Sequence, residues 1–192
     1  MKINRLAVRL CMCALVLFRA LSLYADGKDS LSRKMIHIAG IDVKPAYVFP
    51  THEFFAGNNA TFSPIRKNLS VHLKYGFKFA PDTYLGRMYP HAVQGIGVGY
   101  NTFFHSSELG TPWSVYAFQT SRIASLTPRL SLDYEWNFGA SFGWKKYDAE
   151  SNPYNRVVGS KMNAYIHLGF LLNWQLDAQT NLRAGIGATH FS

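Results

Sequence analysis

Two long segments of strict alternation, 130–144 and 162–176, constrain the fold more than any other feature of the sequence. Apolar residues occupy every even position of both, and small or polar residues fill most odd positions. A period of two is typical of a β-strand with one apolar face. Strands of soluble sheets are usually about five or six residues long, whereas about 9 to 11 residues of a tilted strand cross the hydrocarbon of a bilayer. The two segments therefore predict an antiparallel transmembrane β-barrel with an apolar outer face and a small, polar inner face.

Five further stretches alternate in the same way and complete a set of about seven strands. They are predicted around 41–49, 69–79, 96–100, 113–124 and 180–192. Pro45 within the first predicts a bulge or an unpaired donor. Long outer loops are expected at 51–67, 105–112 and 145–159, and inner turns at 80–91, 126–128 and 177–179, of which 80–91 is unusually long. A soluble β-sandwich also alternates, but it would have to hide all these aromatic residues in one small core, so the barrel is favoured.

The N-terminus predicts export. A basic head, an apolar segment at 10–18 and small residues up to Ala25 describe a signal peptide over residues 1–25, with an N-terminal helix or a membrane anchor as the alternative. The only cysteines, Cys11 and Cys13, lie within it, so residues 26–192 contain no thiol. No phosphate loop, nucleic-acid module or metal-ligand spacing is present, so we expect no cofactor, no metal and no nucleic-acid partner. A net charge of +9 and 15% aromatic residues fit a protein of the bacterial cell envelope.

The last thirteen residues carry the candidate chemistry. His190 and Ser192 have the same parity as the apolar residues Leu182 and Ile186, so both side chains are predicted on the apolar face of a strand. Residues two apart on a strand lie about 6 to 7 Å apart at the backbone, within reach of a hydrogen bond between their side chains. A neutral histidine can take the proton of a serine hydroxyl as the oxygen attacks an ester carbonyl. His190 is the candidate general base, and Ser192 the candidate nucleophile.

The ending Ala188-Thr189-His190-Phe191-Ser192, preceded by the segment 157–161 and an alternating strand, resembles the PagL-like lipid A 3-O-deacylases of Gram-negative outer membranes. The resemblance is closest to Bacteroidetes-type versions and covers most of the chain from about Ile36, including 68–78 and 129–144. It implies an eight-stranded outer-membrane barrel that hydrolyses the 3-O-linked acyl chain of lipid A, with lipopolysaccharide as its partner. In that family, further small residues build the oxyanion site and a Glu on the next strand orients the His. None of those positions exists here, so we expect a barrel without its final strand that neither closes nor catalyses alone.

Polar residues on the other parity are predicted to fill the barrel as a network, in preference to a second site or a pore. They are His72, Lys74, Lys78, Asp133, Glu135, His167 and Arg183. Basic residues beside the outer loops either pair with lipid A phosphates or are solvated: Arg66, Lys67, Lys145, Lys146, Arg156 and Lys161. Two hypotheses follow from the sequence. The chain is an outer-membrane esterase, or it is a small structural or adhesive barrel in which His190 and Ser192 are incidental.

Overall fold

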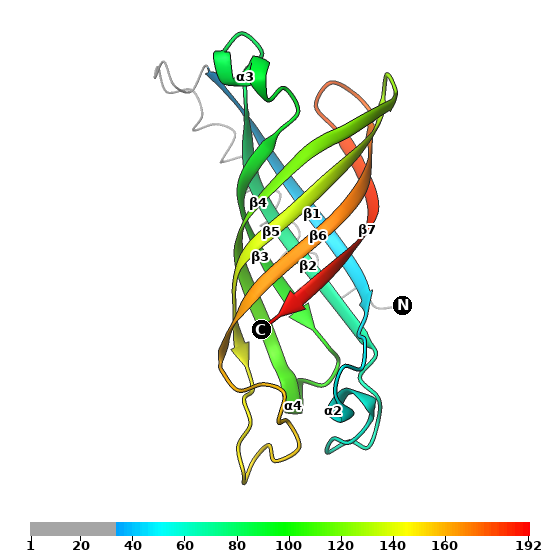
Figure 1. The fold of residues 1–192 in the computed structure, drawn as a ribbon, viewed down its shortest axis with the longest axis vertical. Coiled ribbons are helices and arrows are strands. Elements are labelled where there is room, and N and C mark those ends of the chain that lie inside the picture. The colour runs from blue at the N-terminus through cyan, green and yellow to red at the C-terminus, as the bar shows by residue number, and fades with distance from the viewer. Residues whose placement is uncertain (1–33) are drawn as a thin grey trace, which may run out of the picture.

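The computed structural model describes residues 34–192, and the signal peptide predicted at residues 1–25 lies outside them. Seven strands form one antiparallel sheet, in which each strand pairs with the next along the chain (Figure 1). The strands are β1 (Met35–Tyr47), β2 (Lys67–Phe79), β3 (Val93–Thr102), β4 (Gly110–Thr127), β5 (Leu130–Trp144), β6 (Met162–Gln175) and β7 (Asn181–Phe191). Three short helices lie in the connections: α2 (Glu53–Ala56), α3 (Tyr84–Met88) and α4 (Ser106–Leu109). The all-β class and the seven predicted strands are confirmed.

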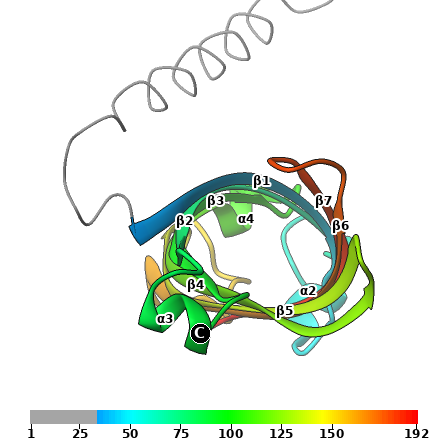
Figure 2. The same cartoon turned by 90° about the horizontal axis from the view of Figure 1, so that it is seen from above.

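The sheet curls into an incomplete barrel whose strands form a ring around a lumen (Figure 2). β1 and β7 are its two edges and do not pair with each other within the described residues. Since antiparallel neighbours alternate in direction, these two odd-numbered strands run the same way. No helix in the described part of the chain is long and apolar enough to cross a membrane.

The two faces of the sheet have opposite chemistry, as the alternation predicts. On β5, Glu135 points into the lumen and is 1% exposed, whereas Phe138 points outward and is 60% exposed. All seven strands expose large apolar side chains on the outside, and we call this surface the outer belt. It includes Ile41, Val43, Leu73, Tyr75, Ile96, Val98, Trp113, Val115, Trp136, Phe138, Ile166, Leu168, Phe170, Trp174, Leu182 and Ile186.

The inner face is less uniformly small and polar than predicted. Tyr116 and Phe118 of β4 and Tyr165 of β6 are buried inside the ring, where they form an apolar cluster. Glycines of other strands make room for two of them, because a Cβ added at Gly97 of β3 would lie 2.4 Å from the Tyr116 ring and one added at Gly76 of β2 would lie 2.9 Å from the Phe118 ring. Large and small side chains therefore alternate across the narrow lumen, as is common in small barrels.

We expect Gly97→Ala to destabilise the fold by about 1–3 kcal/mol, because the added methyl group must displace the buried Tyr116 ring. Gly159→Ala is the matched control, since a Cβ there meets nothing within 4 Å. Denaturant unfolding of both variants in detergent micelles measures the difference. Equal midpoints would show that Tyr116 can move without cost.

The connections gather at two ends of the barrel. The end with α2, α4 and the segment 145–161 is called the loop end, and the end with α3 is called the turn end (Figure 1). Of the two alternatives predicted at Pro45, a bulge or an unpaired donor, the bulge is excluded, since β1 pairs with β2 in unbroken register from Met35 to Tyr47. Proline is tolerated there because β1 is an edge strand.

The loop end is packed into a cap around an apolar cluster, whose buried members are Phe54, Ile65, Phe103, Leu109, Trp144 and Val158. Buried polar groups join the three loops. The Glu108 Oε1 atom accepts a hydrogen bond from the Ala60 N–H at 2.7 Å, and the Asn155 side chain donates to the Glu108 carbonyl at 2.7 Å. Phe191 of β7 packs against this cluster. The cap therefore fixes the end of the strand that carries His190 and Ser192.

Candidate functional site

His190 and Ser192 lie on the outer face of the sheet toward the loop end. His190 pairs in register with Ile166 of β6, whose side chain belongs to the outer belt. Beyond the last residue of β7, the ladder continues through two backbone hydrogen bonds between Ser192 and Ala164, of 2.5 and 3.3 Å. Both side chains are exposed on an apolar surface.

Phe191, between the two, points the other way. Its ring lies 5.0 Å from the Trp144 ring and 5.6 Å from the Tyr165 ring, measured between centroids. Because successive side chains of a strand point to opposite faces, this inward anchor holds His190 and Ser192 on the outside.

The pair is aligned but not in contact. Among residues 34–192, His190 forms neither a hydrogen bond to Ser192 nor an ion pair with a carboxylate. A nucleophile and its base need a separation of about 2.6–3.2 Å, and this contact is often looser without substrate. Rotation about the two χ1 bonds is the movement that would bring the imidazole to the hydroxyl.

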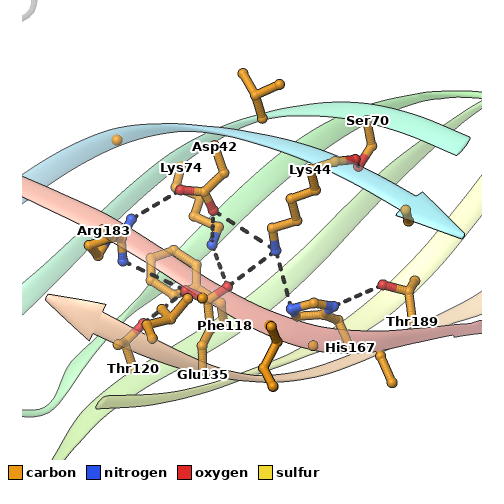
Figure 3. Close-up of a pocket in the computed structure, with 18 of the residues that line it drawn as sticks. Asp42, Lys44, Ser70, Lys74, Phe118, Thr120, Glu135, His167, Arg183 and Thr189 are labelled. Carbon is orange, nitrogen blue, oxygen red and sulfur yellow. Dashed lines mark hydrogen bonds and ion pairs between the residues drawn. The ribbon is translucent and has the colours of Figure 1, made fainter. Parts of the chain in front are cut away.

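A second polar constellation lies inside the lumen (Figure 3). Four residues from four strands form a closed circuit of alternating charge, which we call the charge ring: Asp42, Lys74, Glu135 and Arg183. Lys74 contacts both carboxylates, while Arg183 lies 3.2 Å from the Asp42 Oδ1 atom and 3.7 Å from the Glu135 Oε2 atom. Thr120 donates a further hydrogen bond to the Glu135 Oε2 atom at 3.1 Å. The charge ring spans the lumen and links β1 to β7 through side chains.

Beside the charge ring, a hydroxyl and an imidazole meet at Thr189 and His167. The His167 Nδ1 atom lies 2.8 Å from the Thr189 Oγ1 atom, and its Nε2 atom lies 3.3 Å from the Lys44 Nζ atom (Figure 3). An ammonium group can only donate, so Nε2 accepts and the ring proton is on Nδ1. His167 then donates to Thr189 and cannot take its proton. This arrangement positions side chains and does not activate a nucleophile.

The predicted lumenal residues fall into separate groups. Lys74, Glu135 and Arg183 meet in the charge ring, with His167 next to them. His72 instead bonds Ser70 and Tyr116, and Asp133 accepts hydrogen bonds from Ser131 and Asn173, while Lys78 lines the cavity. Asp42 and Lys44 also lie in this network, although they are not among the residues predicted for it. Their alternation with Ile41 and Val43 was the signal that could have included them.

A cavity of about 1360 Å³ runs along the lumen. Successive residues of both edges line it, at 38–49 on the β1 side and 181–192 on the β7 side, so the cavity opens sideways between the two edges. The described residues contain no group of three His, Cys, Asp or Glu side chains placed to hold a metal ion.

The basic residues of the loop end surround the cap. Arg66 donates to the Phe55 carbonyl and Lys145 to the Ser107 carbonyl, at 3.2 and 3.0 Å. The other four basic residues of this end are exposed: Lys67, Lys146, Arg156 and Lys161.

Asp148 organises the tip of the 145–161 loop. Its Oδ1 atom accepts hydrogen bonds from the Ser151 N–H, the Ser151 hydroxyl and the Glu150 N–H at 2.8–3.1 Å. Donation from the Ser151 N–H, with smaller contributions from the other two donors, lowers the pKa of the Asp148 carboxyl below its ordinary value of 3.8.

We expect this turn to persist at pH 4. A carboxyl whose pKa is lower in the folded state stabilises the fold above its unfolded pKa, and that contribution is lost as the pH falls through the folded pKa. An NMR pH titration of the Asp148 carboxyl carbon measures the value directly. A midpoint at or above 3.8 would contradict the hydrogen bonding seen here.

The fold and site define a curled seven-stranded antiparallel sheet with a polar lumen, an apolar exterior and a His-x-Ser pair on that exterior. Comparisons with protein-family models, curated proteins and solved structures found no match.

Proposed function

We propose that this chain supplies the nucleophile and the base of an outer-membrane esterase, a complete barrel that hydrolyses the 3-O-linked acyl chain of lipid A. The observation that carries the proposal is the position of His190 and Ser192. Both lie at the end of β7, on the apolar outer face near the loop end. A base beside a nucleophile on an apolar exterior suits a substrate whose ester lies within the membrane itself.

The outer belt supports a membrane location. Monomeric soluble proteins rarely expose contiguous apolar patches larger than a few hundred Å², yet here every strand exposes large apolar side chains. Aromatic residues stand near both ends of the belt, with Tyr47, Tyr100 and Trp113 toward the loop end and Trp174 toward the turn end. Membrane barrels carry such aromatic girdles at their two interfaces.

Strand length sets the depth of the pair. The eleven residues of β7, at about 3.3 Å each and tilted by about 40°, rise by roughly 28 Å. This rise matches the thickness of the hydrocarbon layer, so His190 and Ser192 reach one rim of it. With the start of β1 on the periplasmic side, as proposed for an exported barrel, β7 runs outward, and that rim belongs to the outer leaflet, where lipid A carries its ester-linked chains.

The proposed reaction has two halves. The Ser192 Oγ atom attacks the ester carbonyl while the His190 imidazole takes the hydroxyl proton, and the tetrahedral intermediate expels the 3-hydroxyl of lipid A, which receives that proton. Water, deprotonated by His190, then attacks the acyl-serine, releases the fatty acid and restores the Ser192 hydroxyl. The reaction requires no cofactor or metal.

A second candidate is a non-enzymatic outer-membrane barrel with a structural or adhesive role. It is favoured by one observation, that the His190 side chain forms no hydrogen bond to Ser192 and no ion pair with a carboxylate within residues 34–192. In this case the polar pair only marks the interface between lipid and water.

Mass spectrometry of lipid A from Gram-negative cells that make the complete barrel, and from cells that do not, separates the two candidates. The esterase predicts a lipid A species lighter by one 3-O-linked acyl chain, together with free fatty acid. Unchanged lipid A, with the protein present in the outer membrane as a heat-modifiable band, would favour the non-enzymatic barrel. Recovery of the protein only in the soluble fraction would contradict both.

A further inference from the structure

The connection between β2 and β3 is long for the turn end because it builds a fixed helix. The Thr83 hydroxyl caps α3 by accepting a hydrogen bond from the Gly86 N–H at 3.0 Å, and it donates to the Ala80 carbonyl at 2.7 Å. A Cβ added at Gly86 would lie 1.9 Å from the Ala80 oxygen, so only glycine lets the helix fold back so closely. The orientation of α3 is therefore set by the sequence.

This fixed helix presents an apolar face to its surroundings. Tyr84, Leu85, Met88 and Tyr89 are 68%, 41%, 56% and 58% exposed. The spacing of Tyr84, Leu85 and Met88 gathers them on one side of α3, Gly86 is buried, and Tyr89 follows directly at the C-cap. The helix contains no acidic residue, and its one charged side chain, Arg87, donates to the Asp82 carbonyl at 2.8 Å.

The apolar face lies at the turn end, just beyond the strands that carry the outer belt (Figure 1). α3 follows the end of β2, whose outward residues Leu73 and Tyr75 belong to that belt. Seen from above, α3 lies at the edge of the ring and not over the lumen (Figure 2). Tyrosines with an apolar ring and a polar tip are typical of the level where lipid headgroups meet acyl chains.

We propose that α3 and Tyr89 form an interfacial anchor that inserts its apolar face into the headgroup–acyl boundary of the phospholipid leaflet at the turn end. The anchor rests on the proposed membrane location of the barrel. It fixes the depth of the barrel in the bilayer from the end opposite to His190 and Ser192, and it requires no protein partner.

Spin labels on single cysteines test the anchor. The full chain contains only Cys11 and Cys13, so changing both to serine gives a thiol-free background. Met88→Cys and Tyr84→Cys report on the anchor, Ile96→Cys on the outer belt and Asp82→Cys on the polar side of the same connection. In phospholipid vesicles, we expect labels at 88, 84 and 96 to be relaxed more strongly by oxygen than by a water-soluble nickel complex, and the label at 82 to show the reverse.

Each other outcome has a distinct meaning. Labels at 88 and 84 that respond mainly to nickel, while the label at 96 responds to oxygen, would overturn the anchor and leave the membrane barrel standing. Labels at 88 and 84 shielded from both reagents would show a protein contact, which also overturns the anchor. A label at 96 that responds mainly to nickel would contradict the membrane location on which the anchor rests.

Discussion

In the complete barrel, replacement of Ser192 by alanine is expected to abolish deacylation of lipid A while the protein remains in the outer membrane. The change removes the attacking oxygen, and losses of a nucleophile in hydrolases of this kind are about 10⁴- to 10⁶-fold in rate. Because Ser192 is exposed and its ladder bonds to Ala164 use backbone atoms only, the fold does not need its hydroxyl. The rate of fatty-acid release from purified lipopolysaccharide measures the effect.

Ser107→Ala is the matched control, since Ser107 is an exposed serine of the loop end whose only described contact uses its carbonyl. It should retain the release rate of the unchanged protein. The release rate of His190→Gln should be as low as that of Ser192→Ala, because glutamine fills similar space but cannot act as a base near neutral pH. Retention of full activity by Ser192→Ala would remove the esterase proposal and leave the non-enzymatic barrel.

Replacement of Glu135 by alanine is expected to destabilise the fold by about 3–5 kcal/mol, the usual cost of removing one partner from a buried ion pair. The Lys74 and Glu135 side chains are both 2% exposed, so Lys74 would retain only the Asp42 carboxylate as its close partner. Arg183 and Thr120 would also each lose a contact. Urea unfolding in detergent micelles measures the change.

Glu150→Ala is the control for the loss of a carboxylate, because Glu150 is exposed in the 145–161 loop. It should change the free energy of unfolding by less than about 0.5 kcal/mol. Should Glu135→Ala fail to fold, Glu135→Gln keeps the volume of the side chain and still removes the charge. A cost below about 1 kcal/mol in both Glu135 variants would show that the charge ring is dispensable for stability.

Much of the fold could be predicted from the sequence because alternate residues of a strand lie on opposite faces, so their polarity shows which face is buried. The alternation at 130–144 and 162–176 predicts β5 and β6 almost to the residue, and it places Glu135 and His167 inside. The inward direction of Tyr116 and Phe118 was not predicted. It depends on other strands, where Gly97 makes room for Tyr116 and Gly76 makes room for Phe118, and the pattern of a single strand does not reveal this.

The candidate site could likewise be predicted only in part. The common face of His190 and Ser192 follows from parity, because each lies one residue from the inward Phe191. Whether the two side chains meet depends on rotamers and on groups from other strands, which spacing along one strand does not determine. The loop cap was also not predicted, since Glu108 and Asn155 are brought together by tertiary packing across 47 residues.

The contact between Asp42 and Arg183 has a consequence for how the protein folds. It joins the first strand to the last across 141 residues, whereas every backbone ladder joins neighbours along the chain. Hairpins between successive strands are local and close at small entropic cost. A contact between the two edge strands of the sheet instead requires the whole sheet between them to be formed and curled. We therefore expect this ion pair to form late, after the neighbouring strands have paired. Its formation distinguishes a completed ring from a flat or partly assembled ribbon with the same local pairings.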